Sequence, residues 1–118
     1  MLKIGQTVPD FQMDVFHNEE IRKIKLSDYK GKWVVLIFYP ADFTFVCPTE
    51  IAEFARLGRD FADRDAVVLG GSTDNEFVKL AWRRDHKDLD KLPIWQFADT
   101  NGSLTDGLGV RSKDGVAY

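Results

Sequence analysis

The apolar residues of this 118-residue chain fall into short runs separated by polar segments, several of which contain Gly or Pro. The longest run, residues 33–39, holds seven apolar or aromatic side chains, three of them β-branched, which favours a strand over a helix. Because no polar residue alternates with the apolar ones, we expect both faces of this strand to be buried, as in the centre of a parallel sheet. Further strands are expected at 66–71 and 93–98 in the same sheet, the first of them parallel to 33–39.

A helix is expected directly after the first strand. Pro40 ends the apolar run, and a short loop leads to Cys47 and Pro48, where Pro is favoured at the first position of a helix. Apolar residues then recur at spacings of three and four, which predicts a helix that begins within two residues of Cys47 and runs to about Arg64. Its inward face would carry Ile51, Phe54, Ala55, Gly58, Phe61 and Ala62. Strand, helix and strand at this spacing indicate a βαβ unit with a right-handed crossover.

Two segments on either side of this unit have weaker patterns. Residues 11–16 and 21–26 are consistent with a β-hairpin around the polar turn 17–20. Asp74 is a plausible N-cap for a second helix that runs to about His86. The inward residues of that helix would be Phe77, Leu80 and Ala81.

The C-terminal half contains several Gly-based turn signals. We expect Gly70 and Gly71 to form a tight exit from the second strand, and Ser103 to cap a short helix that Gly109 closes. Residues 116–118 have the pattern of a strand that begins there. Strands that alternate with helices give an α/β class, and residues 1–118 contain no linker or repeat, so we expect one domain.

Composition excludes several classes of function. The net charge of −3 and the pI near 5.3 argue against a general nucleic-acid-binding protein. No apolar run is long enough to span a membrane, and the N-terminal residues lack the apolar region of a secretory signal. A single Cys allows no disulfide within one chain. We therefore expect a cytoplasmic protein without a membrane or nucleic-acid partner.

The single thiol, Cys47, is the main candidate for chemistry. A lone Cys is most often a small buried hydrophobic residue, but the apolar stripe of the helix begins only at Ile51 and Cys47 precedes it. The free N–H groups and the dipole at a helix N-terminus stabilise a thiolate, which is the nucleophilic form of the side chain. Thr44 can bring a hydroxyl to the same place, and Pro40 can cover it without offering a competing N–H.

Other possible sites are weaker. His17 and His86 are 69 residues apart and neither has a ligand-spaced partner, so we expect two surface residues and no metal site. The chain has no C-x-x-C motif for dithiol exchange. Trp82 is expected to belong to the core, and residues 83–91, which mix both signs of charge, are expected to be solvated.

The residues around Cys47 resemble a known family. Pro40-x-x-x-Thr44-x-x-Cys47 is similar to the active-site motif of the peroxiredoxins, and YPADFTFVCPTE resembles the typical two-cysteine subgroup, close to the bacterial alkyl hydroperoxide reductases. Further similarity extends along nearly the whole chain. It comprises PDF at 9–11, LSDYKGKW at 26–33, STDNEF at 72–77, AW at 81–82 and DGVA at 114–117.

The resemblance implies a thioredoxin-like fold and a thiol-dependent peroxidase for hydrogen peroxide and organic hydroperoxides. Cys47 would be the peroxidatic residue that becomes a sulfenic acid, while Thr44 and Pro40 would shape its pocket. Glu50 is either a solvated carboxylate in the first helical turn or, as in the family, a residue that orients an active-site Arg. No metal or organic cofactor is implied. The implied partners are a thiol reductant protein and further copies of the chain in a homodimer or higher oligomer.

Two parts of the family pattern are absent from the sequence. Relatives carry an Arg after a segment like DGVA and a resolving Cys near the C-terminus, and this sequence stops at Tyr118 before both, so we interpret it as C-terminally truncated. It also lacks the Gly-Gly-Leu-Gly insertion of peroxide-sensitive relatives. We expect an uncovered edge or apolar face and self-association through Phe43, Phe45 and Trp82. The alternative function is a non-catalytic thioredoxin-like interaction module or an inactive fragment.

Overall fold

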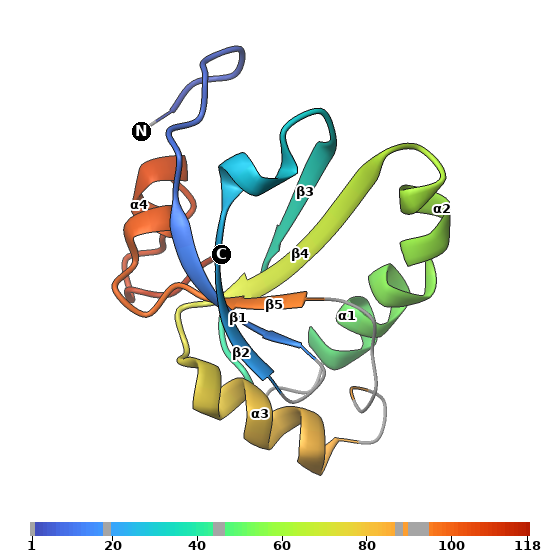
Figure 1. The fold of residues 1–118 in the computed structure, drawn as a ribbon. Coiled ribbons are helices and arrows are strands. Elements are labelled where there is room, and N and C mark those ends of the chain that lie inside the picture. Colours follow the sequence, from blue (N-terminus) through green and yellow to red (C-terminus); the bar gives the residue numbers. More distant parts are fainter. Residues whose placement is uncertain (1, 18–19, 44–46, 87–88, 90–94) are drawn as a thin grey trace.

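A mixed sheet organises the computed structural model, which describes residues 2–17, 20–43, 47–86, 89 and 95–118, with only the backbone described for His17, Cys47 and Pro48. The strand order in the described residues is β2-β1-β5-β4-β3 (Figure 1). The strands are β1 (Gln12–His17), β2 (Glu20–Lys25), β3 (Trp33–Phe38), β4 (Ala66–Ser72) and β5 (Trp95–Ala98). β3, β4 and β5 are parallel, and β1 is antiparallel to both β2 and β5. The expected α/β class, the hairpin and the parallel pairing of the first two predicted strands are confirmed.

Helices cover both faces of this sheet. They are η1 (Leu26–Tyr29), α1 (Cys47–Arg56), α2 (Gly58–Ala62), α3 (Glu76–Asp85) and α4 (Ser103–Leu108). One apolar core joins α1 and α3 to the sheet, and the other joins α4 and η1 to its opposite face. The buried members of the first are Tyr39, Ile51, Ala55, Val68, Trp82 and Leu89, and those of the second are Met13, Val15, Ile24, Leu69, Phe97 and Leu104. Among the described residues, none of the helices is long and apolar enough to cross a membrane.

The strand β3 lies at the edge of the sheet, which corrects the expected central position. Within the described residues it pairs with β4 alone, and Trp33 at its start is 77% exposed. Its side chains do alternate between the two cores: Val35 and Ile37 pack on one, Val34, Leu36 and Phe38 on the other. An unbroken apolar run therefore indicates that both faces of a strand are covered by other elements, but it does not indicate how many strands lie beside it.

The helix after the first strand is interrupted, although the sequence pattern predicts a continuous one. It begins at Cys47, as predicted, but α1 ends at Arg56 and α2 starts at Gly58. Leu57 between them has ψ of 2°, far from the helical value, which turns the chain before α2. The predicted inward face holds for Ile51 and Ala55, which are buried, whereas Ala62 at the end of α2 is exposed.

The helix α3 buries a different face from the one predicted. Phe77 is 63% exposed and Ala81 is also exposed, while Lys79, Trp82 and Arg83 are buried. Two polar residues can face inward because both have partners: Lys79 forms an ion pair and Arg83 lies over the ring of Phe16, 5.5 Å from its centroid. The prediction of a fully solvated segment at 83–91 is therefore wrong for Arg83 and for Leu89, which is also buried. The expected core position of Trp82 is confirmed.

The caps of α3 and α4 also differ by one residue from the expected ones. Asn75 rather than Asp74 caps α3, and its side-chain oxygen accepts a hydrogen bond from the N–H of Val78 at 2.9 Å. Gly102 precedes α4, so Ser103 is the first helical residue, and Gly109 ends the helix at φ 73° as expected. Gly70 and Gly71 lie inside β4 rather than beyond it, since the pairing with β5 continues to Ser72.

Candidate active site

The Cys47 segment lies between the carboxyl end of β3 and the first turn of α1. Tyr39 directly follows β3, and its N–H donates to the carbonyl of Gly71 on β4 at 3.1 Å. Cys47 is the first residue of α1, so its backbone lies where the unpaired N–H groups of the helix favour a negative charge. The predicted roles of the Cys47 thiol and of Thr44 fall on atoms outside the described part of the structure.

Two further predicted site residues are described. Pro40 is exposed at the start of the loop, and Glu50 is exposed in the first turn of α1, where an acidic side chain suits the helix dipole. The structure thus places Pro40 and Glu50 at the two ends of the segment that contains Cys47. Their predicted contributions to the site stay predictions.

The turn at residues 40–43 has a strained backbone. Phe43 has φ of 60°, a left-handed conformation that costs free energy for a residue other than glycine. Its ring centroid lies 6.1 Å from that of Trp82, and the side chain remains 52% exposed. Phe43 is therefore available as a contact with another molecule, as predicted. Trp82 is not, because it is only 1% exposed and packs internally against Tyr39, and Phe45 lies outside the described residues.

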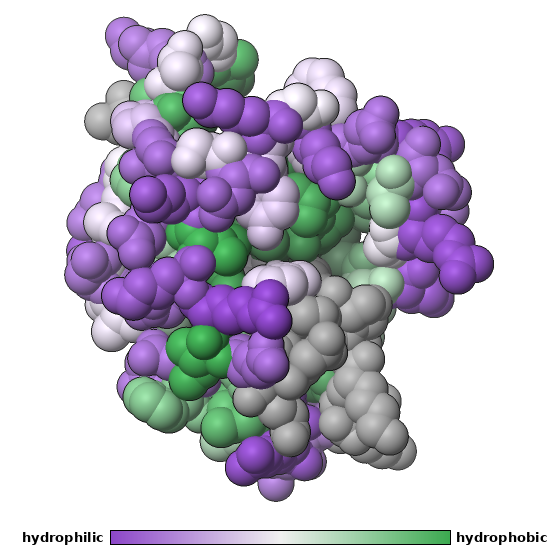
Figure 2. Space-filling model, viewed as in Figure 1, coloured by the Kyte–Doolittle hydropathy of each residue, from purple (hydrophilic) through white to green (hydrophobic). Residues whose placement is uncertain are grey.

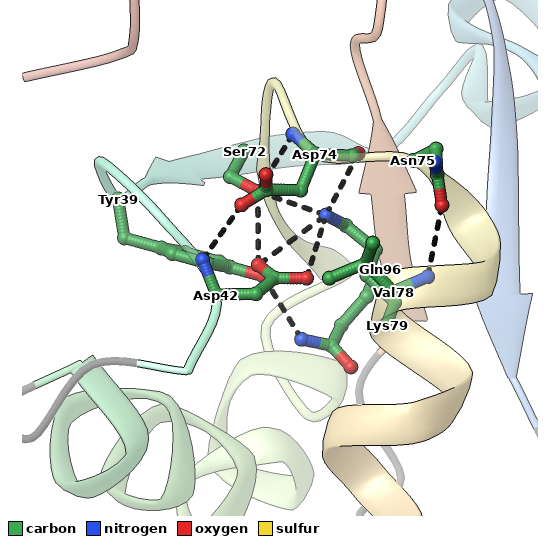
Figure 3. Close-up of polar contacts among 8 residues, drawn as sticks. All are labelled: Tyr39, Asp42, Ser72, Asp74, Asn75, Val78, Lys79 and Gln96. Carbon is green, nitrogen blue, oxygen red and sulfur yellow. Dashed lines mark hydrogen bonds and ion pairs between the residues drawn. The ribbon is translucent and has the colours of Figure 1, made fainter.

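A buried polar network holds this turn (Figure 3). The N–H of Asp42 donates to the carboxylate of Asp74 at 2.7 Å, and the hydroxyl of Ser72 donates to the carboxylate of Asp42 at 2.9 Å. The ammonium of Lys79 lies 3.3 Å from that same carboxylate and 2.9 Å from the Ser72 oxygen. The loop after β3, the end of β4 and the first turns of α3 are thereby joined beneath the turn.

Tyr39 borders the same network. Its phenol oxygen accepts a hydrogen bond from the side-chain amide of Gln96 on β5 at 3.1 Å, and the Lys79 ammonium lies 5.7 Å from the centre of its ring. Burial, reinforced by the neighbouring Asp42 carboxylate, raises the pKa of the Tyr39 phenol well above its usual value. Tyr39 is therefore a neutral hydrogen-bonding group at the base of the loop.

Burial also shifts the pKa values of the ion pair formed by Asp42 and Lys79. It raises the pKa of Asp42, although Lys79 acts in the opposite direction, and it lowers the pKa of Lys79 against the influence of Asp42. The side chains of both residues are fully buried. The pair thus carries a desolvation cost that its mutual attraction offsets only in part.

The sequence pattern does not predict this network. Asp42 falls in the loop, Lys79 lies outside the predicted inward face of its helix, and Ser72 appears only within a family-like string. One signal is present, since Asp42 is the only charged residue in the sequence from Trp33 to Val46. Its partner cannot be inferred, because Lys79 is 37 positions away in the chain.

Within the described residues, the surroundings of this loop offer no metal-binding cluster, but they include an apolar cleft. In the described part of the chain, no group of three or more His, Cys, Asp or Glu side chains could hold a metal ion. A cleft of about 570 Å³ lies between the α1–α2 segment and strands β4 and β5, lined mainly by apolar residues. Figure 2 shows apolar surface within a hollow of the molecule, bordered by hydrophilic side chains.

Comparison with known proteins relates this arrangement to a family. The model of the AhpC/TSA family matches residues 4–118. Alkyl hydroperoxide reductase C of Mycolicibacterium smegmatis is 43% identical over 129 residues, which cover 99% of this chain and 66% of that protein. Peroxiredoxin-2 of Macaca fascicularis is 44% identical over 120 residues, which cover 98% of this chain and 61% of that protein. The chain therefore spans slightly less than two thirds of the length of these relatives.

Solved structures agree with the sequence matches. AhpC of Mycobacterium tuberculosis superposes with a TM-score of 0.88 at 40% identity, over 99% of this chain and 72% of that one. AhpC of Enterococcus faecalis superposes with a TM-score of 0.92 at 34% identity, over 96% of this chain and 68% of that one. The thioredoxin-like fold of the peroxiredoxins, expected from the motif at Cys47, is thereby confirmed. The family match, the relatives and the shared fold agree, and the chain belongs to the AhpC/TSA family.

Proposed function

We propose that the chain is a thiol-dependent peroxidase that reduces hydrogen peroxide and organic hydroperoxides with Cys47 as its nucleophile. One observation carries the proposal: in this member of the AhpC/TSA family, α1 begins at Cys47, directly after the loop that leaves β3. The N-terminus of a helix lowers the pKa of a thiol and so increases the fraction of reactive thiolate at neutral pH.

In the proposed reaction, one peroxide oxygen is transferred to Cys47 and the other leaves in the product. The Cys47 thiolate attacks one peroxide oxygen, so that a sulfur–oxygen bond forms as the oxygen–oxygen bond breaks. The leaving oxygen takes a proton and departs as water or an alcohol, and Cys47 becomes a sulfenic acid. A thiol reductant protein then attacks that sulfur and releases water, and a second thiol completes the reduction by forming a disulfide in the reductant.

The neighbouring residues have distinct proposed roles. The Thr44 hydroxyl and backbone N–H groups of the loop hold the peroxide and stabilise charge on the leaving oxygen. Pro40 limits the access of water to the thiolate and the sulfenate. Glu50 adds a carboxylate in the first turn of α1, where in the family it helps to orient an Arg. Neither a metal nor an organic cofactor takes part in this scheme.

We further propose a homodimer or larger homo-oligomer in the cytoplasm, with a role in antioxidant defence. The half-exposed ring of Phe43 and the exposed ring of Trp33 at the β3 edge support an interface between copies. A reducing compartment keeps the single thiol free for each cycle. Sedimentation at micromolar concentration tests the assembly, and a Phe43→Ser variant should shift it toward monomer.

Direct measurement of the thiol reaction tests the peroxidase proposal. The reduced chain is mixed with hydrogen peroxide or cumene hydroperoxide, and the loss of free thiol is followed together with dimedone labelling of sulfenic acid. Cys47→Ser should abolish peroxide consumption, because an alcohol is far too weakly acidic to replace the thiolate. A wild-type rate no faster than that of free cysteine would favour a non-catalytic interaction module instead.

A further inference from the structure

Among the residues that the structure describes, Lys79 is the most deeply buried charged residue, and the proposed reaction does not use it. It lies on the inward face of α3, with no exposed surface. Its ammonium donates to the Asp42 carboxylate at 3.3 Å, to the Ser72 hydroxyl at 2.9 Å and to the carbonyl of Asp74 at 3.2 Å. An ammonium has three N–H donors, so protein acceptors account for all of them. Lys79 therefore has no donor left for a substrate.

The main partner of Lys79 belongs to the turn that leads to Cys47. Asp42 is five positions before Cys47, and it is held by both its side chain and its backbone. The Asp42 carboxylate accepts hydrogen bonds from Lys79 and Ser72. The backbone N–H of Asp42 donates a hydrogen bond to the Asp74 carboxylate. The next residue, Phe43, adopts a left-handed backbone conformation, which persists only where surrounding contacts hold it.

The energetics of the pair favour a role in geometry. A buried ion pair adds little net stability compared with apolar residues of similar volume, since both charges lose their hydration. It does penalise any displacement of one partner, because the other would then be an unpaired buried charge. Figure 3 shows the Lys79 ammonium between the Asp42 carboxylate on one side and Ser72, at the end of β4, and Asp74, just before α3, on the other. The pair thus restricts the turn to one position relative to the sheet.

We propose that Lys79 is a positioning residue for the Cys47 site: through Asp42 it fixes the turn at 40–43 and hence the geometry of the peroxide-binding loop. This inference rests on the proposed peroxidase function. A displacement of about 1 Å in a reacting group can reduce a rate by about 100-fold. Alkylation of the thiol by a small reagent needs the thiolate but not the arrangement that holds a peroxide.

The variants are chosen to separate geometry from stability. Lys79→Met removes the charge and keeps most of the side-chain volume, but it leaves the Asp42 carboxylate unpaired. The double variant Lys79→Met, Asp42→Asn removes both charges and relieves that penalty. Lys23→Met serves as the matched control, because Lys23 is an exposed lysine on β2 whose nitrogen lies 3.9 Å from Asp14.

Three measurements are made on each folded variant at low temperature: the rate with peroxide, the rate with iodoacetamide, and amide hydrogen exchange in residues 40–47. We expect Lys79→Met to lose about 10- to 100-fold in the peroxide rate, with alkylation changed by less than about threefold. The double variant should regain thermal stability but not the peroxide rate. Both should exchange faster at 40–47, and Lys23→Met should match the wild type in all three measurements.

Two outcomes would overturn the inference. The first is a wild-type peroxide rate in folded Lys79→Met with only a lower melting temperature, which would make the pair a purely structural contact. The second is unchanged hydrogen exchange at 40–47 in both Lys79 variants. Exchange does not depend on peroxidase activity, so it decides the positioning role even if the wild-type chain proves inactive and the proposed function fails.

Discussion

Gly71 on β4 lies directly against Phe97 on β5. A methyl group at Gly71 would overlap both a ring carbon and the backbone oxygen of Phe97, well inside van der Waals contact. The two residues are in register across the parallel pair, and the carbonyl of Gly71 accepts the N–H of Tyr39 at the start of the Cys47 loop. The absence of a side chain at this position therefore lets β5 approach β4 immediately beside the candidate site.

Gly71→Ala should destabilise the chain. The backbone atom of Phe97 cannot rotate away, so the strands must separate, and overpacking of this kind costs about 1–3 kcal/mol. Chemical denaturation monitored by circular dichroism measures the change. Gly58→Ala on α2 is the matched control, since its added methyl group would meet no atom within 4 Å beyond its chain neighbours and its own helix backbone. It should be neutral or stabilising by up to about 1 kcal/mol. Equal stability of the two variants would contradict this account of Gly71.

Tyr39→Phe should also reduce stability. The substitution keeps the ring that packs on Trp82, but it removes the oxygen that accepts from the buried amide of Gln96. A buried donor without its partner costs about 1–3 kcal/mol. Tyr118→Phe, at an exposed ring, provides the control and should change the free energy of unfolding by less than about 0.5 kcal/mol. If Tyr39→Phe changed the free energy of unfolding as little as Tyr118→Phe, the hydrogen bond between Tyr39 and Gln96 would not contribute to stability.

Asp10 should contribute to stability near neutral pH and lose that contribution in acid. The N–H and the hydroxyl of Ser27 both donate to its carboxylate at 2.9 Å, and these hydrogen bonds lower the pKa of Asp10. A pKa that is lower in the folded than in the unfolded state stabilises the fold above the unfolded-state value, and this contribution disappears as the pH falls through the folded-state value.

Urea denaturation of the wild type and Asp10→Asn between pH 7 and pH 3 tests this dependence. The variant should be less stable at pH 7, and the difference should narrow toward pH 3. Ser27→Ala, which removes the hydroxyl donor and keeps the N–H donor, should show an intermediate dependence. A difference between wild type and Asp10→Asn that is constant across this range would show that the ionisation of Asp10 is not coupled to folding.

Thr44→Val tests the proposed chemistry of the loop. The substitution preserves the shape of the side chain and removes its hydroxyl, so the reaction with peroxide should lose about 2–4 kcal/mol of transition-state stabilisation. Alkylation of Cys47 by iodoacetamide should change little, and Thr44→Ser should have a much milder effect because it keeps the hydroxyl. Stopped-flow measurement of thiol loss gives both rates. Thr44 would have no part in the mechanism if wild type and Thr44→Val consumed peroxide equally fast.

Local signals in the sequence were sufficient to predict the strand before Cys47 and the start of the helix at Cys47. The apolar run ending near Pro40, the Pro after Cys47 and the spacing of Ile51 and Ala55 predicted the strand and the start of the helix, and both are found. These features depend on residues close together in the chain, where strand and helix periodicities and terminal preferences operate. The same stretch carried the motif that indicated the family.

The tertiary structure decided which elements became neighbours and which polar groups could be buried. The apolar composition of β3 predicted a central strand. Its position at the edge of the sheet arises because β4 pairs with β5 on its other side. Lys79 looked like an outward residue of a helix, because burial of a lysine is unfavourable without a partner. That partner, Asp42, reaches it only when the turn after β3 packs against α3, so the ion pair beneath the candidate site depends on a contact between distant segments of the chain.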